Sequence, residues 1–434
     1  MDDISVLPLV LSGFVFLLTF VGIVRERFHR AIVAFAGAVL MVVVGIAFGI
    51  YSESQAVTAI DFNTLALLFG LMIVVEIFKT TGFFPYLAIK VGKLARGSPW
   101  RLMLTLGLFT TLVSMFLDNV TTIMLVAPVT ILLADILGIT ALPLLMSEAL
   151  LSNIGGVATL IGDPPNVLIG SAASLSFTDF LIHLAPVAFF AWLLTQALLL
   201  LMFRKELSQP PSNLARLEEM DERKALVHPS AARRMVGILT VTIVLFFVHD
   251  RIGLQPGFVA LIGAALGLLV IRPPLRKILG DMPWDVILFF VSLFVIVGGL
   301  EACGLLRLIT KAILGLTMYG VEVTALVILW MSAIMASLVD RIPFTIAMLP
   351  ILGALGAHGV RVEPLWWALA LGVGFGANGT PIGSMTNVVM VSISEEAGTP
   401  LTFRAWLKKG PVVTFGTCVI ASLALIVGIR LGFF

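Results

Sequence analysis

A short polar stretch inside an apolar region constrains this chain more than any other feature. Between Leu151 and Leu168 the sequence contains three glycines and two adjacent prolines, Pro164 and Pro165. Proline cannot continue the hydrogen-bond ladder of a helix, and glycine weakens the turn that contains it. Non-helical backbone at membrane depth is tolerated only where protein buries it or where it lines a water-filled cavity. We therefore expect an unwound helix at a binding site, and the alternative is an extramembrane loop between two helices.

A second copy of this pattern favours the unwound helix. Residues 376–388 align without a gap with residues 155–167, so that each position recurs 221 residues later. Matching positions upstream recur after 222 residues, and a near-constant offset indicates an internal duplication. The equivalent pairs include Gly155 and Gly376, Thr159 and Thr380, Gly162 and Gly383, Asn166 and Asn387, Asp118 and Asp340, and Pro128 and Pro350.

The composition predicts an all-α polytopic membrane protein. Of 434 residues, 59% are hydrophobic and 12% are charged, about half the charged fraction of a soluble domain. Several apolar runs approach the ~20 residues that span a bilayer, and no short alternating segments of a β-barrel occur. A net charge of +2 gives no reason to expect nucleic-acid binding. Cys303 and Cys418 match no metal or redox spacing, and no P-loop or nucleophile–base pair occurs, so we expect no enzyme, metal or cofactor.

Basic residues predict the orientation in the membrane. The clusters within 25–30 and 79–101 follow the first and third apolar runs, and the positive-inside rule places both in the cytoplasm. The third run, 62–78, therefore crosses from outside to inside. Its equivalent, 284–300, begins beside the basic residues 276–277 and crosses in the opposite direction. The halves are thus predicted to be inverted, with both termini outside a bacterial inner membrane, which is the architecture of secondary transporters.

The segments around the two acidic tips are predicted to be re-entrant. Residues 102–117 and 120–136 are apolar arms on either side of Asp118 and Asn119, and each is shorter than a comfortable span. A re-entrant hairpin with its tip near the midplane fits better than two full spans, which remain the alternative. Each repeat then has about five transmembrane helices plus one hairpin, with broken helices at the midplane. The predicted organisation is a first inverted repeat at 1–203, a cytoplasmic linker at 204–234 and a second inverted repeat at 235–434.

Acidic side chains are the candidates for proton coupling. A carboxyl group at membrane depth is costly and usually functional, and it can exchange a proton near physiological pH. Asp118 and Asp340 are predicted at the hairpin tips, whereas Glu148 and Asp163 belong to the first broken helix. The alternatives are that Arg341 neutralises Asp340 and that Glu148 only reaches a polar interface. Two acidic tips also disfavour a dianionic substrate.

Uncharged groups around the tips and the glycine motifs are the candidates for substrate binding. Hydroxyl and amide side chains offer hydrogen bonds to a small polar solute or a partly dehydrated cation. We expect no catalytic or metal-ligating residues. The predicted binding residues are Asn119, Thr121, Thr122, Gly155, Gly156, Thr159, Asn166, Thr345, Asn378, Thr380, Ser384 and Asn387.

The motifs resemble those of a known superfamily. The run from Asn153 to Asn166, with Asp118-Asn-Val-Thr-Thr122 upstream, is similar to the ion-transporter superfamily. It is most similar to the branch that holds the arsenite-efflux permeases of the ArsB type and the P protein. More distant relatives are sodium/proton antiporters of the NhaD type and sodium/dicarboxylate carriers. The dicarboxylate group has Ser-Asn-Thr at its tips, from which Asp118-Asn119-Val120 and Asp340-Arg341-Ile342 depart.

The resemblance implies a function as well as a fold. It implies a scaffold domain, a moving transport domain, and exchange of arsenite or antimonite, a small inorganic solute, for protons. A separate ATPase subunit and a homodimer are further expectations, and the lipid bilayer is the surrounding partner. Sodium/proton antiport is the leading alternative, followed by organic-anion transport and by a membrane enzyme or scaffold that moves nothing.

Overall fold

The computed structural model describes residues 6–25, 28–208, 211, 219 and 221–434. Every regular element within these ranges is a helix. Eight of the helices so described are long and apolar enough to cross a membrane, which confirms the polytopic membrane fold. The middle of the predicted linker and Arg27 of the first basic cluster lie outside the described residues.

The first half has two leading helices, a hairpin and a broken helix, in the order expected. Its hairpin is formed by α6 and α7, and its broken helix by α8 and α9. The bounds are α1 Val6–Val24, α2 Arg30–Ala47, α3 Glu53–Thr58, α4 Phe62–Lys79, α5 Phe83–Leu94, α6 Pro99–Ser114, α7 Asn119–Leu137, α8 Leu142–Val157, α9 Pro164–Ala173, α10 Phe177–Met202 and α11 Arg204–Leu207.

The second half repeats this order. Its hairpin is formed by α18 and α19, and its broken helix by α20 and α21. The bounds are η1 Glu222–Ala225, α13 Pro229–Val248, α14 Pro256–Ile271, α15 Leu275–Asp281, α16 Trp284–Ala302, α17 Leu305–Thr317, α18 Val321–Leu338, α19 Arg341–Ala357, α20 Glu363–Gly376, α21 Met385–Glu396, α22 Phe403–Leu407 and α23 Gly410–Leu431.

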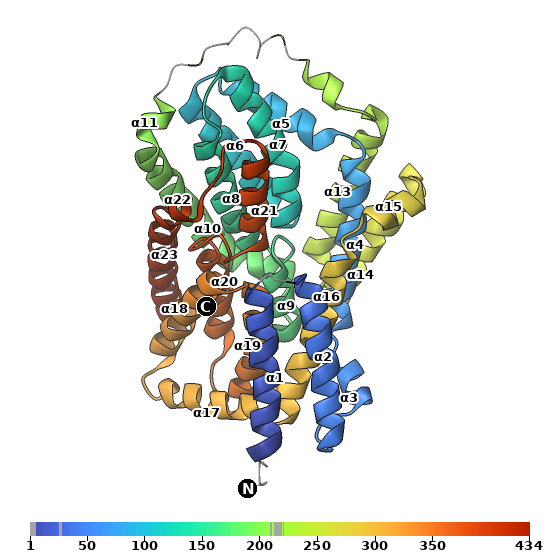
Figure 1. Ribbon diagram of the computed structural model, residues 1–434, viewed down its shortest axis with the longest axis vertical. Coiled ribbons are helices and arrows are strands. Elements are labelled where there is room, and N and C mark those ends of the chain that lie inside the picture. Colours follow the sequence, from blue (N-terminus) through green and yellow to red (C-terminus); the bar gives the residue numbers. More distant parts are fainter. Residues whose placement is uncertain (1–5, 26–27, 209–210, 212–218, 220) are drawn as a thin grey trace.

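The two hairpins enter the molecule from opposite ends, as inverted repeats require. In Figure 1, α6 and α7 lie in the upper half beside α5, whereas α18 and α19 lie in the lower half above α17. The α6 arm has 16 residues and is therefore about 24 Å long, shorter than the ~30 Å hydrocarbon core. The short α6 arm favours the predicted re-entrant hairpin, whereas α7 and α18, with 19 and 18 residues, are long enough to cross a membrane, so two full spans remain the alternative.

Both glycine motifs interrupt helices, as predicted. The first interruption separates α8, which ends at Val157, from α9, which begins at Pro164. The second separates Gly376 from Met385. Pro164 stands at the first position of α9, where its missing N–H costs no hydrogen bond. The alternative of an extramembrane loop is wrong, because residues 158–162 are buried.

Each hairpin packs tightly on the broken helix of its own half. Helix α6 packs against α8 as α18 packs against α20. A Cβ atom added to Gly155 would collide with the carbonyl oxygen of Thr111, and one added to Gly376 would collide with that of Ala333. Only glycine allows this backbone approach. Hairpin and broken helix therefore form one packed unit in each half.

A second set of contacts joins the halves. Helix α4 of the first half packs against α14 of the second, and α2 packs against α16. Each of these pairs combines α2 or its equivalent α14 with α4 or its equivalent α16 from the other half. The four helices form a frame beside the two hairpin units.

The second half begins earlier than the sequence boundary. Helix α13 starts at Pro229, within the segment 204–234 that was assigned to the linker. Arg233 and Arg234 are exposed on this helix, so the helix extends beyond its apolar run without burying charge. The described end of the linker also contacts the first half, where Lys93 donates to Glu222 at 2.7 Å and thereby lowers the pKa of Glu222.

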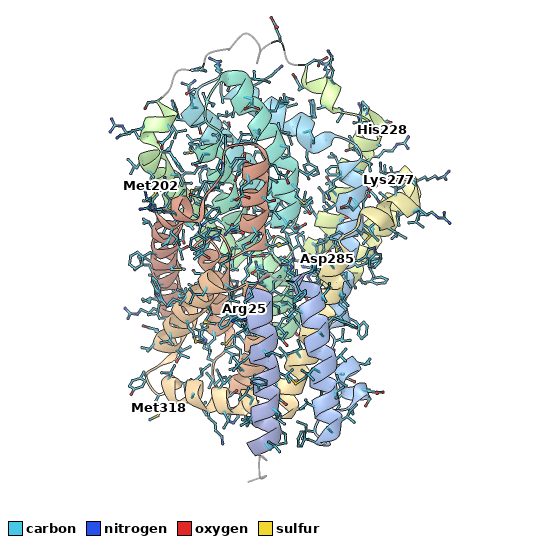
Figure 2. All side chains as sticks on the ribbon, in the orientation of Figure 1. Arg25, Met202, His228, Lys277, Asp285 and Met318 are labelled. Atoms are coloured by element: carbon cyan, nitrogen blue, oxygen red, sulfur yellow. The ribbon has the colours of Figure 1, made fainter. Side chains whose placement is uncertain are left out.

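Single cysteines can test the inverted topology. We expect cysteines at Ser52 and Tyr319 to react with an impermeant thiol reagent from outside, and cysteines at Ser98 and Ser208 to stay unlabelled. Met318, the neighbour of Tyr319, lies at the end opposite to His228 and Lys277 (Figure 2). The native Cys303 and Cys418 are buried, so they should contribute little background labelling. Labelling of Ser98 and Tyr319 positions from the same side would contradict inverted repeats.

Candidate functional site: the cavity between the hairpin tips

A cavity of about 310 Å³ lies where both hairpin tips meet both broken helices. Its walls also include residues of the frame helices α2, α4 and α16. Within the described chain, six carboxylates and three basic side chains line it, so its charge balance is acidic. The polar lining comprises Arg30, Glu76, Lys79, Asp118, Asn119, Thr121, Asp163, Asp281, Asp285, Asp340, Arg341, Ser384 and Thr386.

Helix capping positions the two tip carboxylates. Asp118 precedes α7, and its Oδ1 accepts hydrogen bonds from the backbone N–H groups of Val120 and Thr121, each at 3.0 Å. Asp340 precedes α19 in the same way and accepts from Ile342 N–H at 3.1 Å. Aspartate is a favoured N-cap, and a helix N-terminus stabilises negative charge. Both carboxylates therefore stay at the cavity wall when the hairpins fold.

Asp340 pairs with a residue of the opposite half. Arg30 Nη1 lies 3.1 Å from Asp340 Oδ2, and both side chains are largely buried. The suggestion that Arg341 neutralises Asp340 is wrong, because the cap turns Asp340 toward the start of α19 while Arg341 extends into the protein. Arg30 and Asp340 also line a second cavity of about 370 Å³ beside the α1–α2 turn. Sequence reasoning used Arg30 only as a marker of orientation.

Arg341 is the central cation of the site. Its Nη1 lies 2.7 Å from Asp163 Oδ2, and both side chains are at least 95% buried. Its Nη2 donates to Ser384 Oγ at 3.3 Å and to Asn153 Oδ1 at 3.4 Å. Two charges buried in this way hold each other in place, because either one alone would be strongly destabilised.

Positions that differ between the two repeats indicate this ion pair. Arg341 occupies the position of Asn119 in the other repeat, and Asp163 occupies that of Ser384. Each half therefore has one charged residue that its counterpart lacks, and the structure brings the two together. Comparison of unmatched positions in the repeats would have identified Arg341, which sequence reasoning left out of the site.

An amide cluster joins the two broken helices. Asn153 Nδ2 donates to Asn378 Oδ1 at 2.8 Å and to Asn387 Oδ1 at 3.0 Å. Ser384 Oγ donates to Asn153 Oδ1 at 3.2 Å. All four residues are buried. Asn153 was not among the predicted binding residues, and its counterpart in the second repeat is Gly374.

Asn119 connects the first tip to the cluster. In the amide orientation that satisfies its neighbours, its oxygen accepts from Arg341 Nη2 at 3.1 Å and its nitrogen donates to Ser152 O and Gly162 O at 3.1 Å. Gly156 allows this approach, since an added Cβ would lie 2.5 and 2.9 Å from the two terminal atoms of the Asn119 amide. Thr121 also lines the cavity.

Other predicted residues hold the unwound backbone. Thr159 donates to Met115 O, and its counterpart Thr380 donates to Ser337 O at 2.5 Å. The amide nitrogen of Asn166 bonds three carbonyl groups between Gly156 and Thr159, and that of Asn387 bonds the carbonyls of Ala377 and Thr380. These hydrogen bonds attach each broken helix to its hairpin. They support the cavity wall from the side that faces away from the cavity.

Ten predicted residues lie outside the cavity lining, and three of them, Thr122, Glu148 and Thr345, neither hold the unwound backbone nor join the amide cluster. Glu148 is fully buried and accepts a hydrogen bond from Thr130 Oγ1 on α7. Thr345 Oγ1 donates to Arg341 O at 2.8 Å. Thr122 is buried. The carboxyl group of Glu148 has no basic partner among the described ion pairs.

Comparisons with known proteins identify a family and several relatives of this chain. Residues 20–372 match the family model described as citrate transporter (CitMHS). A "46 kDa membrane protein" of Mycobacterium leprae is 36% identical over 96% of this chain and 98% of its own length. An uncharacterized transporter of Mycobacterium tuberculosis is 37% identical, with 96% and 97% covered. The P protein of Sus scrofa is 30% identical over 98% of this chain and 59% of its own length, which confirms the resemblance to P-protein sequences.

A solved structure shares the architecture. The YdaH transporter of Alcanivorax borkumensis superposes with a TM-score of 0.63 at 14% identity, covering 94% of this chain and 99% of its own. At this identity the similarity concerns the fold alone.

Proposed function

This chain belongs to the citrate transporter family (CitMHS), and we propose that it is a proton-coupled secondary transporter of a small uncharged inorganic solute. Arsenite and antimonite are the proposed solutes, with efflux in exchange for protons as the direction. Transport as such is the activity of the family; the solute and the coupling are the proposal.

The charge balance of the cavity carries the proposal. Six carboxylates face three basic side chains around about 310 Å³. Like charges at close range repel strongly in a low-dielectric site, so a trianionic citrate would be opposed by the net negative charge of the lining. Arsenite at neutral pH is an uncharged trihydroxy compound, and hydroxyl and amide side chains can bind its oxygens without thiols. The uncharged polar side chains of the cavity wall, Asn119, Thr121, Ser384 and Thr386, offer such groups.

The tip carboxylate of Asp118 is the proposed proton carrier. It lines the cavity, and within the described residues its hydrogen-bond partners are backbone groups at the start of its own helix. Asp340 differs, because Arg30 already neutralises it. A carboxylate without a basic partner at membrane depth is the group whose protonation state can change during a transport cycle.

The packing suggests which parts move. The hairpin and the broken helix of each half pack as one unit, whereas α2, α4, α14 and α16 pack across the halves. We propose that the hairpin units form a transport domain that moves against this frame, so that the cavity faces each side of the membrane in turn. The Arg30–Asp340 pair crosses the boundary between frame and hairpin and would separate during this motion.

Sodium/proton antiport is the second candidate. Carboxylate, amide and carbonyl oxygens surround the cavity, and hard cations prefer oxygen ligands. The acidic charge balance would attract sodium as well. The fixed guanidinium of Arg341 at the centre of the site opposes a bound cation, and for this reason the uncharged solute is preferred.

Flux assays in proteoliposomes separate these candidates. We expect arsenite transport that rises with an imposed proton gradient and exceeds that of empty liposomes, with little competition from citrate. Sodium-driven dequenching of a pH dye in the absence of arsenite would instead establish the antiporter. Citrate uptake as the main flux would refute the argument from charge balance. The absence of any flux of arsenite, sodium or citrate would refute both candidate functions.

A further inference from the structure

Two buried side chains in the cavity wall retain unused hydrogen-bonding capacity. Asp163 is fully buried, and Oδ1 has no hydrogen-bond partner in the described parts of the chain. Thr386, at the start of α21, is 1% exposed, and its Oγ1 is likewise unpaired there. Both residues line the cavity. A buried polar group without a partner is costly, so its retention beside a cavity calls for a ligand.

Arg341 adds a donor to these two groups. Its Nη1 contacts Asp163 Oδ2 at 2.7 Å as an ion pair, yet makes no directed hydrogen bond within the described residues. Nη2 is committed to the amide cluster, as described above. The wall therefore offers an acceptor on Asp163, a donor on Arg341 and a hydroxyl on Thr386, contributed by three separate segments.

From these groups we propose that Asp163, Arg341 and Thr386 form a subsite for an uncharged, hydroxylated solute. The inference rests on the proposed function and names the chemistry by which that site recognises its solute. A solute hydroxyl donates its hydrogen to Asp163 Oδ1, and the solute oxygens accept from Arg341 Nη1 and Thr386 Oγ1.

The same groups exclude the competing solutes. A metal cation cannot accept a hydrogen bond from Arg341, and it would meet a guanidinium at short range. A fully deprotonated polyanion has no hydrogen to donate to Asp163, and the carboxylate would repel it. A neutral compound with several hydroxyl groups satisfies all three positions, since each hydroxyl both donates and accepts.

Direct binding measurements on the purified full chain test the subsite. Calorimetric titration at neutral pH would use arsenite and boric acid as uncharged hydroxylated probes, with sodium and citrate for comparison. We expect Thr386→Val to weaken binding of the hydroxylated probes about five- to tenfold, the loss of one neutral hydrogen bond. Thr386→Ser should restore most of it. The charge-neutral double variant Asp163→Asn with Arg341→Gln should weaken binding more than about tenfold.

The matched control is Thr417→Val. Thr417 is a buried threonine on α23 whose hydroxyl donates to Val413 O at 2.9 Å, so the substitution removes a buried hydroxyl far from the subsite in the chain and binding should be unchanged. If the double variant fails to fold, the Thr386 variants decide alone.

The outcomes distinguish this inference from the proposed function. Binding of the hydroxylated probes that is unchanged by Thr386→Val would overturn the subsite and leave arsenite transport standing. Binding of boric acid without arsenite would support the subsite and overturn arsenite as the solute. If neither probe binds the wild type, both proposals are overturned.

Discussion

Asp118→Asn is expected to reduce uphill, proton-driven efflux to the level of empty liposomes. Asparagine caps a helix about as well as aspartate, so its side-chain oxygen can still accept the hydrogen bonds from Val120 and Thr121 that fold the tip. The substitution therefore removes the ionisable carboxyl group and keeps the shape. Exchange of solute at equal concentrations should survive, because exchange requires the site but no net movement of protons.

The pH dependence gives a second readout of the same group. Asp118→Glu should retain partial activity with a shifted pH profile, since the longer carboxylate reaches a different environment. Glu148→Gln is the control, because Glu148 lies outside the cavity lining and the glutamine oxygen can still accept from Thr130. Full proton-driven efflux in Asp118→Asn, together with its loss in Glu148→Gln, would place the proton carrier on the broken helix and contradict the assignment to the hairpin tip.

Arg341→Met is expected to destabilise the protein by about 3–5 kcal/mol, because it leaves the buried carboxylate of Asp163 without its cation. The ion pair at 2.7 Å is almost inaccessible to solvent, so water cannot replace the guanidinium. The same substitution removes the donors to Ser384 and Asn153, and we expect solute transport to be lost as well. Unfolding by denaturing detergent, followed by circular dichroism, measures the stability.

A double-mutant cycle separates the charge from the packing. Asp163→Asn alone should also destabilise, since it leaves Arg341 unpaired, whereas Asp163→Asn with Arg341→Met should recover most of the loss. Arg30→Met is the matched control, because the Arg30–Asp340 pair is partly accessible and longer, at 3.1 Å, and its loss should cost less. A single Arg341→Met variant as stable as the wild type would contradict a structural role for the pair.

The repeat architecture could be read from the chain because its signals are local. A cluster of glycines followed by two prolines weakens a helix locally, so the interruption between Val157 and Pro164 can be predicted from adjacent residues. The length of an apolar run decides whether it can cross the hydrocarbon core. The offset of 221 to 222 residues then predicts that whatever holds for one half holds for the other.

The partners of the charged residues could not be predicted from local sequence signals or from the repeat. Arg341 lies next to Asp340 in the sequence, yet it pairs with Asp163, and Asp340 pairs with Arg30, 310 positions away. Proximity along the chain suggested the wrong partner, because helix capping turns neighbouring side chains in different directions. Asn153 was missed for a related reason, since its partners Asn378 and Asn387 belong to the other repeat.

Sequence by itself determined the membrane class, the inverted duplication, the hairpins, the broken helices and the acidic tips of this protein, because each depends on residues within a few turns of one another or on a fixed repeat. Only the tertiary structure decided which groups meet. The cavity draws its walls from two hairpins, two broken helices and three frame helices, and their side chains become neighbours only when the halves pack face to face. Charge pairing and hydrogen bonding act over a few ångströms, whereas the partners are separated by hundreds of residues along the chain.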